Sequence, residues 1–155
     1  MHKSPYFIIS VVISLALFFT ACKKEDPESI WKRDRERLLN YISENELDAQ
    51  EHESGLFYVV DEEGTGAKPN LDSRVQIKYV GYFLDEKVFD LNNGAVFNLR
   101  GTIPGWQIGI PLFKVGSKGM LLIPSALGYG QYPPYGSGVP RNSCLIFDIE
   151  IIDLI

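Results

Sequence analysis

Residues 74–79, Arg-Val-Gln-Ile-Lys-Tyr, alternate strictly between polar and apolar side chains. Because successive side chains of a β-strand point to opposite faces, this period of two is typical of a strand with one buried face. A similar alternation runs through residues 145–152, and residues 120–123 form a shorter apolar run between Gly119 and Pro124. These segments predict the strands of a sheet.

Helical patterns are confined to two places. In residues 27–47, apolar side chains recur at three- and four-residue steps, which favours an N-terminal helix; they are Trp31, Leu38, Tyr41 and Ile42. This helix would either pack on the main domain or act as a spacer. A polar link over 48–55 and a strand over 56–60 follow.

Residues 104–113 suggest one short helix within the strand-rich region, because Gly109 and Pro111 interrupt them. Several strands with one brief helix predict an antiparallel α+β domain.

The N-terminal segment has the features of an export signal. Lys3 precedes an uncharged, mostly apolar run over 6–19, which is short of the roughly 20 residues needed to span a bilayer and fits a secretory signal better. The run ends in Phe-Thr-Ala-Cys at 19–22, which resembles the lipobox of bacterial lipoproteins. A buried N-terminal helix is the alternative interpretation.

Lipidation of Cys22 is therefore expected. The following Lys-Lys-Glu-Asp at 23–26 resembles the export signals of Bacteroidota surface lipoproteins. The chain would comprise a lipoprotein signal peptide (1–21), a lipid-anchor tether and helix (22–54) and a globular domain (55–155). We expect it in a bacterial cell envelope, anchored to a membrane, with the outer membrane favoured and the periplasmic or surface face left open.

The composition argues against several classes of protein. The chain has 155 residues, 45% of them hydrophobic, and a net charge of -5 without a Lys/Arg cluster, so nucleic acid is not an expected partner. Two histidines and two cysteines leave too few ligands for a metal site, and no cofactor is expected. The chain has no G-x-S-x-G motif, and its glycine-rich stretch 128–138 lacks the Lys-Ser/Thr ending of a phosphate loop.

Aromatic residues at strand ends and beside glycines carry the remaining signal. They are Tyr79, Phe89, Trp106, Tyr129 and Phe147. Taken singly, each is explained as ordinary core packing, and Trp106 could simply plug the sheet.

Five ordered stretches of this region resemble the FKBP-type peptidyl-prolyl isomerases. They are GTGAKP (64–69), VQIKYVGYFLDEKVFD (75–90), IPGW (103–106), KVGSKGMLLIPSALGYG (114–130) and VPRNSCLIFDIEII (139–152). The resemblance implies an antiparallel sheet curled around one short helix, in agreement with the periodicity, and its core covers residues 72–155.

By this resemblance the aromatic residues would line a pocket for proline. Trp106 would form its floor, Tyr79, Phe89 and Phe147 its walls, and Ile103 and Val139 an aliphatic rim. The backbone N–H of Ile103 and the hydroxyl of Tyr129 would donate hydrogen bonds to substrate carbonyls. Asp90 would accept hydrogen bonds at the pocket edge.

The sequence departs from the family around Asp90. Residues 91–94 read as a short loop in place of a longer segment that often carries an arginine partner for the aspartate, so Arg100 or a tyrosine hydroxyl is expected to substitute. Ala95 stands where some members place another aromatic wall, which predicts a wider or shallower pocket there.

The implied function is peptidyl-prolyl cis-trans isomerisation in extracytoplasmic client proteins, assisting their folding. Proline-containing polypeptides are the expected partners, macrolides such as FK506 or rapamycin are expected ligands, and a monomer is expected. The alternative is a non-catalytic module that binds proline peptides, and a third interpretation takes the aromatic residues as core alone.

Overall fold

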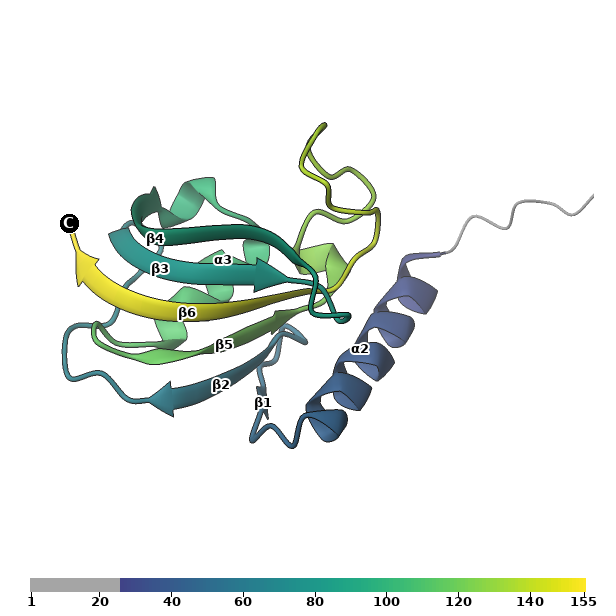
Figure 1. Ribbon diagram of the computed structural model, residues 1–155, viewed down its shortest axis with the longest axis horizontal. Helices are drawn as coiled ribbons and strands as arrows, with labels where there is room; N and C mark the ends of the chain where they lie inside the picture. The colour runs from purple at the N-terminus through teal and green to yellow at the C-terminus, as the bar shows by residue number, and fades with distance from the viewer. Residues whose placement is uncertain (1–25) are drawn as a thin grey trace, which may run out of the picture.

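The computed structural model describes residues 26–155, which form one six-stranded antiparallel sheet with helices on both faces (Figure 1). The expected signal peptide (1–21) and lipidation site Cys22 lie outside the described residues. Within residues 26–155, no helix is long and apolar enough to cross a membrane.

The sheet has the strand order β1-β2-β5-β6-β3-β4, with every neighbouring pair antiparallel. The strands are β1 (Gln50–Glu51), β2 (Phe57–Glu62), β3 (Arg74–Tyr82), β4 (Val88–Asn98), β5 (Lys118–Ile123) and β6 (Leu145–Leu154). The helices are α2 (Pro27–Glu44) and α3 (Pro104–Gly109), with short 3₁₀ turns at Leu99–Gly101, Ile110–Leu112 and Ser125–Leu127. The predicted α+β class, with a sheet around one short helix and a helix before it, is confirmed.

Strands β2, β5 and β6 supply alternate side chains to two separate apolar clusters, one on each face of the sheet. One cluster lies on the α3 face and contains Leu121, Phe147 and Ile149. The other lies on the α2 face, where Leu122 and Ile146 meet Leu38 of the helix. The mostly apolar stretches in β5 and the start of β6 follow from this arrangement, because residues there are buried on both sides.

Helix α2 packs on the sheet. Of the two alternatives for this helix, packing on the main domain is therefore confirmed and the spacer is not. Asp26 caps its first turn, with Oδ1 accepting a hydrogen bond from the Ser29 N–H at 2.9 Å. The helix ends at Glu44, three residues before the predicted end, where Asn45 donates to the Tyr41 carbonyl at 2.9 Å.

The buried face of α2 differs from the predicted stripe. Leu38 and Tyr41 are buried as expected, but Ile30 and Asp34 join them. Asp34 lies outside the predicted apolar stripe, yet its charged side chain is fully buried. Its buried hydrogen-bond partner Ser125 lies 91 residues further along the sequence, so helical periodicity could not reveal the burial.

The predicted loop after Asp90 was wrong, because β4 continues through it to Asn98. Gly94 forms a bulge with φ of 137°, and the pairing register with β3 shifts around it. The Asn92 side chain accepts hydrogen bonds from the N–H groups of Gly94 and Ala95 at 3.1 and 2.8 Å. A sequence that looks like a turn is thus accommodated as a bulge inside a strand.

Candidate active site

A cavity of about 330 Å³ opens between the sheet and α3. Six of the eight predicted site residues line it, namely Tyr79, Asp90, Ile103, Trp106, Tyr129 and Phe147. The remaining lining residues are Phe97, Gly101 and Thr102. The cavity walls are largely aromatic, with a few polar groups on the rim, which is the usual composition of a small-ligand site.

Trp106 is the centre of the aromatic cluster. Tyr79, Phe97 and Phe147 each meet it edge-on, with ring centroids 5.1, 5.2 and 5.3 Å from the indole. Such edge-to-face contacts favour a fixed geometry. The indole is only 4% exposed, and its Nε1–H has no hydrogen-bond partner within residues 26–155.

Two glycines allow the rings and α3 to approach the sheet this closely. A Cβ atom on Gly81 of β3 would lie 2.8 Å from ring carbons of both Phe89 and Phe147. A Cβ atom on Gly105 of α3 would lie 2.6 Å from Ile123 on β5. Larger residues at either position would push the pocket walls apart.

Asp90 is held by Tyr79 rather than by an arginine. The Tyr79 hydroxyl donates to Asp90 Oδ2 at 2.7 Å, and the Leu91 N–H donates to Oδ1 at 2.9 Å. Arg100 instead pairs with Asp72 at 2.6 Å, so of the two expected substitutes the tyrosine is confirmed and Arg100 was wrong. Burial, together with the nearby Asp90 charge, raises the pKa of Tyr79 well above its ordinary value and keeps the hydroxyl protonated.

Two donors at the rim have no acceptor in the described part of the chain. The Tyr129 hydroxyl makes no hydrogen bond there, and its pKa is raised by burial and by the charge of Asp90. Ile103 precedes the first turn of α3; its carbonyl accepts from the N–H groups of Trp106 and Gln107, while its own N–H has no partner. Both donors are available to carbonyl groups of a bound peptide.

Phe89 and Val139 lie in a neighbouring hollow rather than in the main cavity. This hollow of about 270 Å³ shares Asp90 and Tyr129 with the cavity. Phe89 meets Phe147 edge-on at 5.6 Å, which joins the two spaces. All eight predicted residues therefore belong to one continuous surface.

Phe97 is the main residue that the sequence reasoning missed. It packs against both Tyr79 and Trp106, with ring centroids 5.8 and 5.2 Å away. Alternation along β4 places residues 95 and 97 on the same face, so the aromatic wall expected near Ala95 is supplied two residues later. Reading 91–94 as a loop concealed this alternation.

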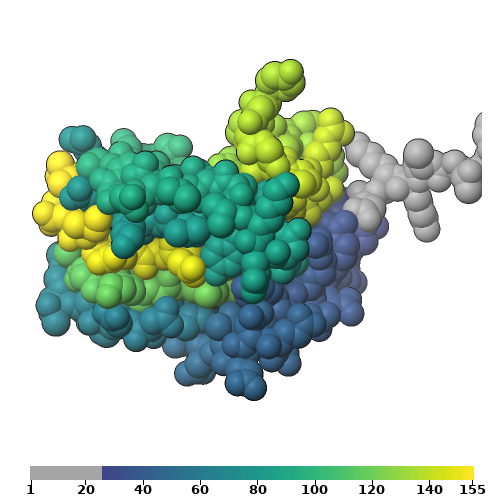
Figure 2. Space-filling view, viewed as in Figure 1, coloured from purple at the N-terminus to yellow at the C-terminus, as the bar shows by residue number. Residues whose placement is uncertain are grey.

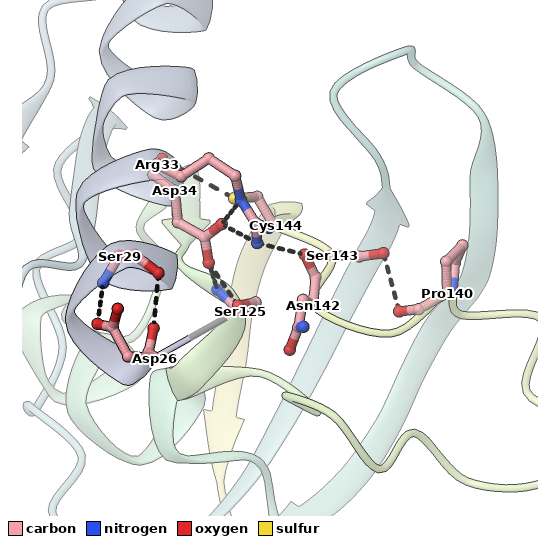
Figure 3. Close-up of polar contacts among 9 residues, drawn as sticks. All are labelled: Asp26, Ser29, Arg33, Asp34, Ser125, Pro140, Asn142, Ser143 and Cys144. Atoms are coloured by element: carbon pink, nitrogen blue, oxygen red, sulfur yellow. Dashed lines mark hydrogen bonds and ion pairs between the residues drawn. The ribbon is translucent and has the colours of Figure 1, made fainter. Parts of the chain in front are cut away.

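A buried polar cluster connects α2 to the segment that carries Tyr129 (Figure 3). Asp34 Oδ2 accepts hydrogen bonds from the Ser125 N–H at 2.9 Å and from the Ser125 hydroxyl, and both side chains are fully buried. The Ser125 carbonyl in turn accepts from the N–H groups of Gly128 and Gly130 at 3.0 and 2.9 Å. The helix is thereby linked to the turn on either side of Tyr129.

Cys144 lies beside the same cluster, with its Sγ 3.9 Å from the Asp34 carbonyl oxygen. Burial and the Asp34 charge raise the pKa of this thiol to about 12. The side chain therefore acts as an apolar packing group near neutral pH.

Comparison with known proteins identifies the family. The family model described as FKBP-type peptidyl-prolyl cis-trans isomerase matches residues 65–152. The FKBP-type isomerase FkpA of Aeromonas hydrophila is 43% identical over 105 residues, covering 64% of this chain and 38% of that protein. The FKBP-type 22 kDa isomerase of Escherichia coli is 36% identical over 123 residues, covering 76% of this chain and 59% of that protein. The chain thus spans less than two thirds of the length of both relatives.

Solved structures agree in fold. A peptidyl-prolyl cis-trans isomerase from Pseudomonas syringae superposes with a TM-score of 0.72 at 28% identity, covering 85% of this chain and 98% of that one. FkpA from Escherichia coli superposes with a TM-score of 0.67 at 29% identity, covering 98% of this chain and 73% of that one. The sheet, the aromatic pocket and the matched sequence together show that this chain belongs to the FKBP-type peptidyl-prolyl cis-trans isomerase family.

Proposed function

We propose that the chain catalyses cis-trans rotation of X-Pro peptide bonds. The observation that carries the proposal is the aromatic cavity around Trp106. Two donors at its rim, the Tyr129 hydroxyl and the Ile103 N–H, have no acceptor within residues 26–155. A prolyl ring would lie against the indole, and the donors would hold the flanking carbonyl groups.

The chemistry of rotation requires no more than this. The barrier of about 18–20 kcal/mol comes from amide resonance, which is lost as the bond twists. A twisted amide separates less charge than a planar one, so an apolar cavity favours the transition state over the solvated ground state. Each 1.36 kcal/mol of that preference is about tenfold in rate. No covalent bond forms or breaks, and therefore no nucleophile is needed.

The polar side of the pocket supports orientation of the substrate. Asp90 is fixed by the Tyr79 hydroxyl at 2.7 Å, which places a carboxylate at the pocket edge. We infer that it accepts hydrogen bonds from the substrate or orients Tyr79 against the prolyl ring. Phe89 and Val139 extend the contact surface for residues that flank the proline.

A protease-coupled assay on a short X-Pro peptide tests this proposal. The purified chain should accelerate isomerisation above the uncatalysed rate, which has a time constant of tens to hundreds of seconds. Binding is followed separately by Trp106 fluorescence in a Trp31→Phe background, because the chain has two tryptophans. Binding without acceleration would identify a proline-binding module. If the chain showed no binding and no acceleration, the aromatic cluster would be core packing alone.

We further propose an extracytoplasmic location, with the chain cleaved after residue 21 and lipid-anchored through Cys22. The apolar run and the Phe-Thr-Ala-Cys sequence support this. Proline-containing polypeptides outside the cytoplasm would be its clients, macrolides such as FK506 or rapamycin would compete for the pocket, and the chain would act as a monomer. Labelling with radioactive palmitate should be lost in Cys22→Ala, and an unlabelled parent chain would end the anchor proposal.

A further inference from the structure

A second hollow, of about 480 Å³, lies between α2, the turn that joins β3 to β4, and the segment before β6. Figure 2 shows the turn between the helix and the projecting 131–143 segment. Its lining combines the apolar residues Phe83, Leu84 and Pro140 with the charged residues Arg37, Asp85 and Arg141. Its volume exceeds that of the aromatic cavity.

Both arginines of this hollow are available to a ligand. Neither Arg37 nor Arg141 forms an ion pair or hydrogen bond with another residue of the described chain, and both are exposed. Other cations of α2 are paired, as in the two hydrogen bonds of 2.8 Å from Arg35 to Glu51. On a chain with a net charge of -5, two free guanidinium groups facing one hollow form a local site for anions.

Neighbouring residues link this hollow to the proline pocket. The pocket shares Asp90 and Tyr129 with the space lined by Phe89 and Val139. From there Phe89 stacks on Phe83, with ring centroids 4.9 Å apart, and Phe83 lines the hollow beside α2.

The chain itself gives a second connection between these spaces. Val139 lines the intermediate hollow and its neighbour Pro140 lines the one beside α2. A polypeptide held at its proline could therefore continue along a single surface to the arginines.

We propose that this surface binds the substrate segment flanking the proline and selects segments that carry acidic residues. The inference rests on the proposed isomerase function and names the substrate class of the same site. Apolar side chains of the segment contact Phe83, Leu84 and Pro140, and its carboxylates pair with Arg37 and Arg141. The carboxylate of Asp85 repels an acidic residue placed beside the β3–β4 turn. The preference for acidic residues therefore applies only near Arg37 and Arg141.

The test compares two peptides that share one X-Pro core. In the first, the extensions on both sides of the core contain Glu and Asp; in the second, Gln and Asn replace them. The full chain should show a kcat/KM about three- to tenfold higher for the acidic peptide at low ionic strength, because two exposed charge pairs each contribute modestly. The preference should fall as salt is added.

Variants assign the preference to the hollow. Arg37→Gln with Arg141→Gln should abolish it while leaving turnover of a short uncharged peptide unchanged. The control is Arg74→Gln with Lys68→Gln, which removes equal charge near the start of β3, the opposite end of that strand from Phe83. The proposal would be overturned if the Arg37/Arg141 variant kept the parent chain's preference for the acidic peptide. It would also be overturned if the control variant lost that preference to the same extent.

The experiment distinguishes failure of the proposed isomerase function from failure of the proposed preference for acidic segments. If the parent chain turns over no peptide, the proposed function is wrong, and fluorescence anisotropy of the labelled peptides decides the inference alone. Tighter binding of the acidic peptide, lost only in the Arg37/Arg141 variant, would support it. Equal affinities for both peptides would reject it.

Discussion

The two faces of the sheet are built largely from alternate residues of the same strands, but the aromatic cavity lies on the α3 face. On the α3 face, aromatic rings meet edge-on around Trp106 and leave space between them. On the α2 face, mostly aliphatic residues such as Leu38, Leu122 and Ile146 are fully buried. The family match begins at residue 65 and therefore does not include α2.

The comparison predicts that the α3 face determines activity while the α2 face contributes stability. The largest effect is expected for Trp106→Ala, which should lower the free energy of unfolding by about 3–5 kcal/mol and remove turnover. Leu38→Ala on the opposite face should cost about 2–5 kcal/mol but leave kcat/KM of the folded protein within twofold. Denaturant unfolding and isomerase assays on both variants measure this, and loss of turnover in folded Leu38→Ala protein would contradict the separation.

The next prediction concerns the contact that joins the two faces. Asp34→Ala leaves the buried N–H and hydroxyl of Ser125 without an acceptor, which should cost about 1–3 kcal/mol. Because the Ser125 turn carries Tyr129, kcat/KM should also fall. If Asp34 acts by positioning Tyr129, that fall should largely disappear when Asp34→Ala is made in a Tyr129→Phe background.

Arg35→Ala is the control for this experiment, since it breaks an exposed α2 ion pair with Glu51. It should cost less than about 1 kcal/mol and leave kcat/KM unchanged. An equal fall in kcat/KM for Asp34→Ala in both Tyr129 backgrounds would show that the carboxylate acts on the pocket by another route.

Substitution of Asp90 should change activity with little effect on stability. The side chain is exposed and its partner is the Tyr79 hydroxyl, so Asp90→Ala should alter stability by no more than about 1.5 kcal/mol while lowering kcat/KM. Tyr79→Phe removes the same hydrogen bond, and the double variant should lose less than the sum of the two single losses. Strict additivity in kcat/KM would mean that the two groups act separately.

The smallest effect is expected at Asp148, on the α2 face of β6 beside Tyr82. Partial desolvation raises the pKa of Asp148, and the charge of Asp61 adds to it. A carboxyl whose folded-state pKa is raised stabilises the fold below its unfolded pKa of about 4, and this contribution is lost as pH rises through the folded pKa. Asp148→Asn should therefore be more stable than the parent at pH 7, by less than about 1 kcal/mol because of solvent screening.

Thermal unfolding between pH 3 and 8 measures this difference. It should vanish near pH 3, where Asp148 is protonated in both folded and unfolded chains. A variant that is less stable than the parent at pH 7 would show that the Tyr82 hydroxyl bond, 3.0 Å long, outweighs the desolvation.

The sequence predicted β2, β3, β5 and β6, because the pleat of the sheet buries residues in a regular pattern, but it missed β1 and β4. It also predicted the eight residues that the structure brings to one surface. It failed at Asp34, whose partner Ser125 lies 91 residues away, and at Phe97, hidden behind an Asn-Asn-Gly stretch that reads as a turn. Both failures depend on tertiary contacts. Asp34 is buried because it accepts hydrogen bonds from Ser125, and β4 continues past Gly94 because its pairing with β3 accommodates a bulge there.

Exchange NMR on a proline peptide tests the central claim most directly, because it follows cis-trans interconversion without a protease. A small amount of the chain, far below the peptide concentration, should accelerate exchange between the cis and trans signals, and Leu38→Ala should retain this acceleration while Asp90→Ala loses most of it. Shifts of the peptide signals on binding, with no change in the exchange rate, would contradict catalysis by the pocket around Trp106.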